Sequence, residues 1–159
     1  MTFPNGFDEI VAEYGNPKLF LRADGTIHPS WEGVALGTCV LPEPLPLGWD
    51  EETKVSRIRV HRKLVLPLEA IFKEIHDAGF WSLLKTFDGC YAWRAKRGAK
   101  KLSLHCWGIA LDFNADTNQL GEDGDMPLEI VNVFVKHGWE WGGKWERKDM
   151  MHFQAARGY

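Results

Sequence analysis

The sequence predicts an α+β domain in which a small, mainly antiparallel sheet carries a metal site and helices pack on the opposite side of the sheet. Three observations favour this class. Apolar and polar residues alternate as they do in strands at 57–61 and 109–114. Apolar residues recur at helical spacing at 7–14, 67–79 and 127–137. These segments do not alternate regularly along the chain, which argues against a parallel α/β arrangement.

Length and composition favour one folded unit. A chain of 159 residues fits a single domain, residues 1–159, that buries roughly 70% of its unfolded surface without disulfide support. The net charge of −3 and the pI near 6.1 provide no general attraction to nucleic acid. No run approaches the roughly 20 apolar residues of a membrane span. We expect a monomer with no nucleic-acid partner and no membrane insertion.

The N-terminal part carries no recognisable chemistry. Residues 1–60 are predicted to wrap around a core of residues 61–159 that holds the metal site. A short amphipathic helix is expected to end at Gly15, and residues 16–55 are rich in proline and glycine, with one short strand expected at 38–41. The acidic start of the chain does not fit a signal peptide, so we expect synthesis in the cytoplasm.

Two longer helices supply much of the predicted core. The first opens at Pro67 and stops at Gly79, and the second opens at Pro127 and stops at Gly138. The side chains expected to point inward are Leu68, Ile71, Phe72 and Ile75 in the first helix and Ile130, Val131, Phe134 and Val135 in the second.

Several potential metal ligands are interpreted as structural. Cys39, Cys90 and Cys106 are odd in number and widely spaced, which favours reduced, buried thiols over a disulfide framework. His28 and His61 lack partners at ligand spacing. We interpret both histidines as surface or hydrogen-bonding residues.

The segment SLHCWGIALDFN contains the first candidate metal ligands, His105 and Asp112. Residues seven apart point to opposite faces of a flat strand, so these two side chains converge only if the chain turns between them. Gly108 is the expected position of that turn. The alternation that follows places Asp112 on the polar face of a strand.

A second candidate cluster lies near the C-terminus, where Asp149 precedes His152 by three residues. One helical turn or a tight loop puts these two positions on the same side. His152 can therefore complete a metal site with His105 and Asp112. Two imidazoles and one carboxylate suit a catalytic zinc ion, Zn²⁺, whose fourth position stays open.

These residues resemble a family of zinc peptidases. It includes D-alanyl-D-alanine carboxypeptidases, the D,D-dipeptidases of vancomycin resistance, and the L-alanyl-D-glutamate endopeptidases of phage endolysins, and is here called the LAS-type family. The resemblance extends from Phe87 to Phe153. The matching residues are Ser103-x-His105-x-x-Gly108-x-Ala110-x-Asp112 and Asp149-x-x-His152. The resemblance implies that His105, Asp112 and His152 bind zinc.

The resemblance also implies two catalytic residues. Asp149 corresponds to the general base, and aspartate at this position is found in phage-type endopeptidases, whereas some other members have glutamate. The family has an arginine shortly before the Ser-x-His motif. Arg94 matches it best, and Arg97 is a second candidate. A guanidinium at this position can hold a carboxylate or a developing oxyanion.

Other residues are expected to support the site. Ser103 is predicted to orient it through its hydroxyl. The group of Trp139, Trp141 and Trp145 is either core or the wall of a substrate cleft, and we expect a split in which Trp145 lines the cleft. A nucleophilic mechanism through Cys106 or Ser103 is disfavoured, because the sequence offers no neighbouring base.

The resemblance implies a zinc-dependent peptidoglycan peptidase. We expect a phage endolysin that cleaves the L-alanyl-D-glutamate bond of the stem peptide after another protein has permeabilised the membrane. One alternative is a D-alanyl-D-alanine carboxypeptidase or dipeptidase. Another is a non-catalytic, zinc-bearing protein of the virion or one that binds the cell wall. Asp149 counts against this last alternative, because a purely structural ion needs no base beside a ligand.

Overall fold

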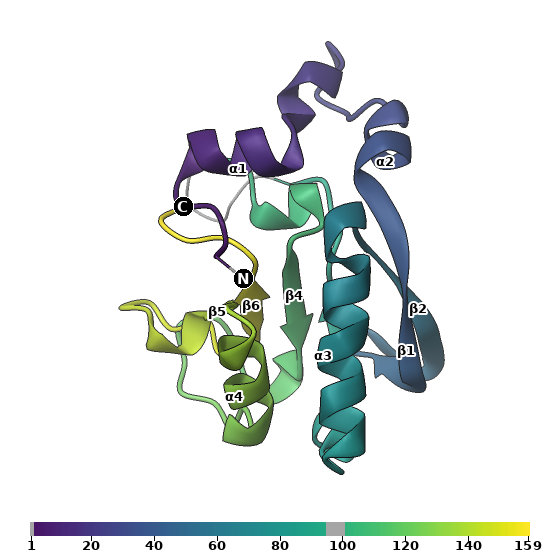
Figure 1. Cartoon of the computed structure of the whole chain (residues 1–159), viewed down its shortest axis with the longest axis vertical. Coiled ribbons are helices and arrows are strands. Elements are labelled where there is room, and N and C mark those ends of the chain that lie inside the picture. Colours follow the sequence, from purple (N-terminus) through teal and green to yellow (C-terminus); the bar gives the residue numbers. More distant parts are fainter. Residues whose placement is uncertain (1, 95–100) are drawn as a thin grey trace.

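The computed structural model describes residues 2–94 and 101–159, and these form the expected α+β fold (Figure 1). The described residues contain one open six-stranded sheet in the order β2-β1-β3-β4-β6-β5. All neighbouring strands are antiparallel except β1 and β3. The strands are β1 (Leu36–Leu47), β2 (Asp50–His61), β3 (Phe87–Gly89), β4 (Ala110–Phe113), β5 (Glu140–Trp141) and β6 (His152–Gln154).

Four α-helices and several 3-10 helices connect the strands within the described ranges. The α-helices are α1 (Phe7–Tyr14), α2 (Ser30–Ala35), α3 (Val65–Asp77) and α4 (Leu128–Lys136). The 3-10 helices are η1 (Pro17–Phe20), η2 (Arg62–Leu64), η3 (Trp81–Leu83), η4 (Leu104–Trp107), η5 (Ala115–Thr117) and η6 (Gly142–Lys144).

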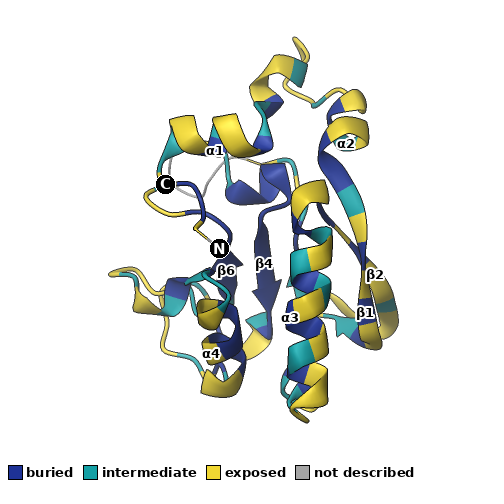
Figure 2. Cartoon of the chain, viewed as in Figure 1, coloured by how far each residue is buried: buried dark blue, intermediate teal, exposed yellow. Residues whose placement is uncertain are grey.

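Helices α3 and α4 cover one face of the central strands. Phe72 of α3 and Phe134 of α4 both pack edge-on or tilted against Phe113 of β4, and Phe134 also contacts Phe153 of β6. Successive side chains of a strand point to opposite faces. The residues just before Phe113 and Phe153 therefore face away from the helices. Figure 2 shows that β4 and β6 are buried along their whole length.

The hairpin of β1 and β2 is much longer than expected. The strands predicted at 38–41 and 57–61 are present, but each belongs to a strand of twelve residues. The pairing is irregular between Val40 and Leu45, the stretch that contains Pro42 and Pro44. Proline is tolerated at such irregularities because no ladder hydrogen bond is needed there. Because proline usually argues against a strand, the sequence alone does not predict the full length of this hairpin.

The predicted apolar stripe of α3 is confirmed, because Leu68, Ile71, Phe72 and Ile75 are all fully buried. The stripe of α4 needs one correction. Val135 was expected to point inward but is exposed, whereas Val133 is buried. At 100° per residue, position 135 lies outside the face centred on residues 130 and 134.

The N-terminal segment supports the 3-10 helix η4. The indole Nε1 of Trp107 in η4 donates to the Gly15 carbonyl at 2.8 Å, and Trp31 Nε1 donates to the Cys106 carbonyl at 2.9 Å. Phe7 of α1 packs edge-on against Trp107. Residues before position 40 therefore hold the turn that precedes β4.

The three cysteines are free and buried, as predicted. Burial raises the pKa of Cys39 to about 12 and also raises the pKa of Cys90 and Cys106. These thiols therefore stay protonated at neutral pH. None of the helices in the described part of the chain has the length and apolar character to span a membrane.

His61 gives the first testable prediction, a pH-dependent loss of stability. Its buried ring donates from Nε2 to the Tyr14 carbonyl at 3.1 Å and accepts at Nδ1 from Lys63 N–H at 3.3 Å. Burial lowers the pKa of His61 from 6.5 to about 4. Between pH 6.5 and about 4, His61 is protonated in the unfolded chain but stays neutral in the folded chain. Stability is therefore complete above that pH and falls by up to about 3 kcal/mol as pH drops toward 4.

Urea denaturation of the chelator-treated protein between pH 4 and 7 measures this loss. The His61→Gln variant should show a shallower dependence over the same window, because glutamine does not titrate. Equal slopes for the two proteins would contradict the assignment to His61.

Candidate metal centre

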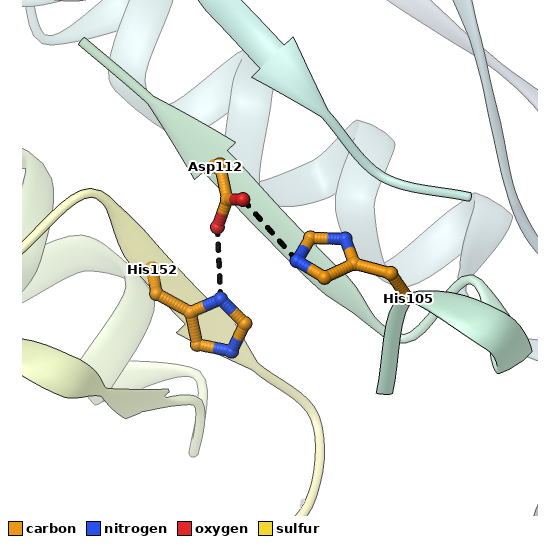
Figure 3. A group of neighbouring side chains, drawn as sticks. All are labelled: His105, Asp112 and His152. Carbon is orange, nitrogen blue, oxygen red and sulfur yellow. Dashed lines mark hydrogen bonds and ion pairs between the residues drawn. The ribbon is translucent and has the colours of Figure 1, made fainter. Parts of the chain in front are cut away.

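The three side chains predicted to bind metal lie together. His105 comes from η4, Asp112 from β4 and His152 from β6 (Figure 3). One nitrogen or oxygen atom of each residue lies within 4.8 Å of the others, and all three residues are buried. Strands β4 and β6 are antiparallel with Asp112 opposite His152, which brings together residues that are 40 positions apart. This group could hold a metal ion.

Gly108 makes the turn that brings His105 toward Asp112. It adopts the left-handed conformation, with φ of 69°, and its N–H donates to the carbonyls of His105 and Leu104. The predicted turn is confirmed. A Cβ atom at this position would lie 2.9 Å from His61 N and 3.2 Å from the Val60 carbonyl carbon. Glycine is therefore required for both conformation and space.

Replacing Gly108 with alanine is expected to destabilise the protein. The left-handed conformation alone costs roughly 1–2 kcal/mol for a residue with a Cβ atom, and the backbone contacts add to this cost. Gly79 also has a positive φ, of 77°, but a Cβ atom there would meet nothing within 4 Å, so Gly79→Ala carries the conformational cost without the contacts. Urea denaturation should show a larger loss for Gly108→Ala than for Gly79→Ala. Equal losses would contradict the close-packing argument.

Asp112 lies between the two imidazoles. Its Oδ2 is 3.2 Å from His105 Nε2 and its Oδ1 is 2.8 Å from His152 Nδ1. Burial alone would raise the pKa of Asp112, but the positive charges that the two histidines carry when protonated and the hydrogen bond from His152 outweigh burial and hold this pKa well below its usual range. The carboxylate is therefore ionised and available as a ligand.

His105 presents one nitrogen without a hydrogen bond. Its Nδ1 lies 2.5 Å from the Cys90 carbonyl, which can only accept, so Nδ1 carries the proton. In the neutral ring, Nε2 then has a lone pair and faces the Asp112 carboxylate. Both groups are hydrogen-bond acceptors, so they cannot form a hydrogen bond with each other. This buried Nε2 has no hydrogen-bond partner among the described residues. A cation between the two atoms would satisfy both, and the donor set fits zinc.

The acidic groups around His152 favour its protonated form. Burial would lower the pKa of His152, but the hydrogen bond to Asp112 and the negative charges of Asp112 and Asp149 outweigh burial and raise it. Metal ligands must be deprotonated, so metal affinity at this site is expected to weaken at low pH.

A cavity of 410 Å³ opens over these ligands. Asp149 lines it together with His105, Asp112 and His152. The His152 N–H donates to the Asp149 carbonyl at 3.1 Å, which closes the predicted tight turn between them. Asp149 therefore borders the same space as the candidate ligands, and its negative charge acts on His152.

Arg94 and Ser103 also line the cavity. The Arg94 carbonyl accepts from Ser103 N–H at 3.2 Å and from Cys106 Sγ at 2.9 Å, so its backbone is tied to η4. Ser103 Oγ accepts from His105 N–H at 3.3 Å and caps η4. Cys106 is thus a buried structural thiol. Arg97 lies outside the described residues.

Trp145 lies beside a candidate ligand and lines the cavity. Its ring centroid is 5.6 Å from that of His152, and its Nε1 donates to Glu140 Oε1 at 2.6 Å. Trp139 and Trp141 are buried. Of these three tryptophans, Trp145 is therefore the one that lines the cavity.

Several residues that line the cavity were not predicted from the sequence. These are Leu104, Leu120, Glu146, Arg147, Met151, Gln154 and Tyr159. Gln154 could have been found, because it lies two residues after His152 and therefore on the same face of a strand. Tyr159 could not, because it packs against Phe7 and Trp107, which lie far from it in the sequence.

Comparison with known proteins gives one match. Residues 97–155 match a family model described as D-alanyl-D-alanine carboxypeptidase. No curated protein and no solved structure matches the chain. The matched range contains His105, Asp112, Asp149 and His152, and it leaves Arg94 outside. Over the part that carries the candidate metal centre, the chain is similar to D-alanyl-D-alanine carboxypeptidases, and this similarity supports a metallopeptidase.

Proposed function

We propose that the protein is a zinc-dependent peptidase of bacterial peptidoglycan that cleaves the L-alanyl-D-glutamate bond of the stem peptide. One observation carries the proposal. Two imidazoles and one carboxylate converge beside a cavity that they line together with another acidic residue, Asp149. Three protein ligands leave a zinc ion one position for solvent, and a structural site would be closed by a fourth.

The proposed reaction is hydrolysis without a covalent intermediate. Zinc, when bound by His105, Asp112 and His152, lowers the pKa of water to about 7 and polarises a peptide carbonyl. Asp149 accepts the proton of the attacking water and delivers it to the leaving amine. Arg94 holds the negative charge that develops on the carbonyl oxygen.

The choice of the bond rests on the resemblance of the sequence to phage-type endopeptidases, in which aspartate is found at the position of Asp149. On this proposal the protein is a single-domain, monomeric endolysin, made in the host cytoplasm, that reaches the wall after the membrane is opened. Ser103 and Trp145 orient the site and line the substrate cleft.

Product analysis tests the proposal. Purified muropeptides are digested with the protein, with the protein and a chelator, and with the chelated protein after zinc is restored. The proposal predicts a new D-glutamate amino terminus in the first and third digests and none in the second. Absence of any cleavage in zinc-loaded samples would instead favour a non-catalytic wall-binding or virion protein.

The second candidate function is D-alanyl-D-alanine carboxypeptidase or dipeptidase activity. The description of the matching family model favours it. The same digests separate the two, because the carboxypeptidase releases free alanine and leaves the L-alanyl-D-glutamate bond intact. Alanine release without a new D-glutamate end would replace the endopeptidase proposal with this one.

A further inference from the structure

We propose that Gln154 is a positioning residue that keeps the proton of His152 on Nε2 and so presents Nδ1 to the metal. The inference rests on the same metal site as the proposed function. It concerns a residue that neither the sequence motifs nor the proposed reaction uses.

The first step is the orientation of the Gln154 amide. Its Nε2 donates to the Ala156 carbonyl at 3.0 Å. An amide nitrogen only donates and a carbonyl oxygen only accepts, so this bond fixes which end of the amide faces which neighbour. The Oε1 atom of Gln154 therefore points the other way, where it lies 3.2 Å from His152 Nε2.

The second step is the proton on His152. Because Gln154 Oε1 can only accept, it is satisfied only when His152 Nε2 carries a hydrogen. In the neutral ring the lone pair is then on Nδ1, which lies 2.8 Å from Asp112 Oδ1 and so faces the candidate metal position. The competing tautomer, with the proton on Nδ1, would donate to Asp112 and block the metal. Gln154 disfavours this tautomer, because it would leave His152 Nε2 and Gln154 Oε1 as two buried acceptors facing each other. In the first tautomer the facing acceptors are His152 Nδ1 and Asp112 Oδ1, and a cation between them would satisfy both.

The two histidines are thus held in opposite tautomers. The Cys90 carbonyl fixes the proton of His105 on Nδ1, and Gln154 fixes that of His152 on Nε2. Partners of this kind set the orientation and basicity of imidazole ligands, and their loss typically weakens metal binding about 10- to 100-fold.

Gln154 is rigidly supported for this role. It is 2% exposed and lies on β6 between Ala110 of β4 and Glu140 of β5. Its side chain shares a face with His152 because the two residues are two apart on one strand. Strand pairing on both sides therefore holds the backbone of Gln154 in place, and the hydrogen bond to the Ala156 carbonyl holds its side chain.

Two variants of the full-length protein separate positioning from packing. Gln154→Met keeps a similar volume but removes the acceptor, so zinc affinity, measured by competition with a chromophoric chelator, should fall about 10- to 100-fold. Gln154→Glu keeps an acceptor for His152 but loses the donor to Ala156. It should be less stable in urea than the native protein and yet bind zinc within a few-fold of native affinity. A merely structural role predicts that zinc affinity falls with stability in both variants.

Nitrogen NMR of the zinc-loaded native protein provides a readout that needs no variant. Long-range proton–nitrogen spectra should show metal on Nδ1 and a solvent-protected proton on Nε2 for His152, with the reverse assignment for His105. Metal on His152 Nε2, or native zinc affinity in Gln154→Met, would overturn the inference alone. Failure of the native protein to bind zinc would overturn the proposed function and this inference with it.

Discussion

Replacing Asp149 with asparagine is expected to reduce peptide hydrolysis about 100- to 10,000-fold while zinc remains bound. Asparagine keeps the size of the side chain but cannot accept a proton from the attacking water. Its backbone carbonyl, which closes the turn to His152, is unaffected by the change. The measurement pairs the rate of cleavage of a purified muropeptide with the zinc content of the same sample by plasma mass spectrometry.

Asp116→Asn is the matched control for this prediction. Asp116 is exposed in η5 and does not line the cavity, so the same chemical change there should leave the rate unaltered. If Asp149→Asn cleaved the muropeptide at the native rate, another group would have to be the base. If it lost zinc as well as activity, Asp149 would be acting as part of the metal site.

Replacing Asp112 with asparagine is expected to lower zinc affinity by more than about 100-fold and to abolish hydrolysis, because a direct ligand contributes more than the groups that merely orient ligands. The buried carboxylate supplies the negative charge in a site otherwise built from two neutral imidazoles. Without it, the pKa of His152 loses the hydrogen bond and the charge that contribute most to raising it. Chelator competition at neutral pH measures the affinity.

The Asp116→Asn protein again serves as the reference, since it changes the net charge of the chain by the same amount. Urea denaturation should first confirm that both variants are equally folded under the conditions of the zinc measurement. A zinc affinity close to the native value for Asp112→Asn would contradict the assignment of Asp112 as a ligand.

Local pattern was enough to predict much of the fold. The periodicity of Leu68, Ile71, Phe72 and Ile75 identified the face of α3, and this helix packs as expected. Positional rules also located the turn at Gly108, because only a chain reversal lets residues seven apart converge. Val135 was misplaced because it lies at the margin of a helical face, where one-dimensional spacing does not decide burial.

The long hairpin illustrates what local pattern misses. Pro42 and Pro44 argue against a strand when read alone, and no residue of β2 before position 58 is buried, so no apolar alternation marks the first part of β2. Its stability comes from pairing between β1 and β2 and from the contact of β1 with α3, including the hydrogen bond from Val40 N–H to Glu69. These interactions join different elements, so the sequence of either strand alone does not predict them.

The metal centre also combines a feature that local sequence predicts with one that depends on strand pairing. The turn between His105 and Asp112 follows from local sequence, whereas the meeting of Asp112 with His152 depends on the pairing of β4 with β6. Family resemblance, not spacing, joined these two halves. The place of Gln154 on the same strand face as His152 follows from their spacing of two, whereas its hydrogen bonds with His152 and Ala156 are known only from the structure.

The most direct test of the account is a crystal structure of the zinc-soaked protein with anomalous diffraction data collected on both sides of the zinc absorption edge. The account predicts one strong zinc peak within bonding distance of His105 Nε2, the Asp112 carboxylate and His152 Nδ1, with solvent as the remaining ligand. A peak elsewhere in the chain, or a fourth protein ligand at this position, would contradict it.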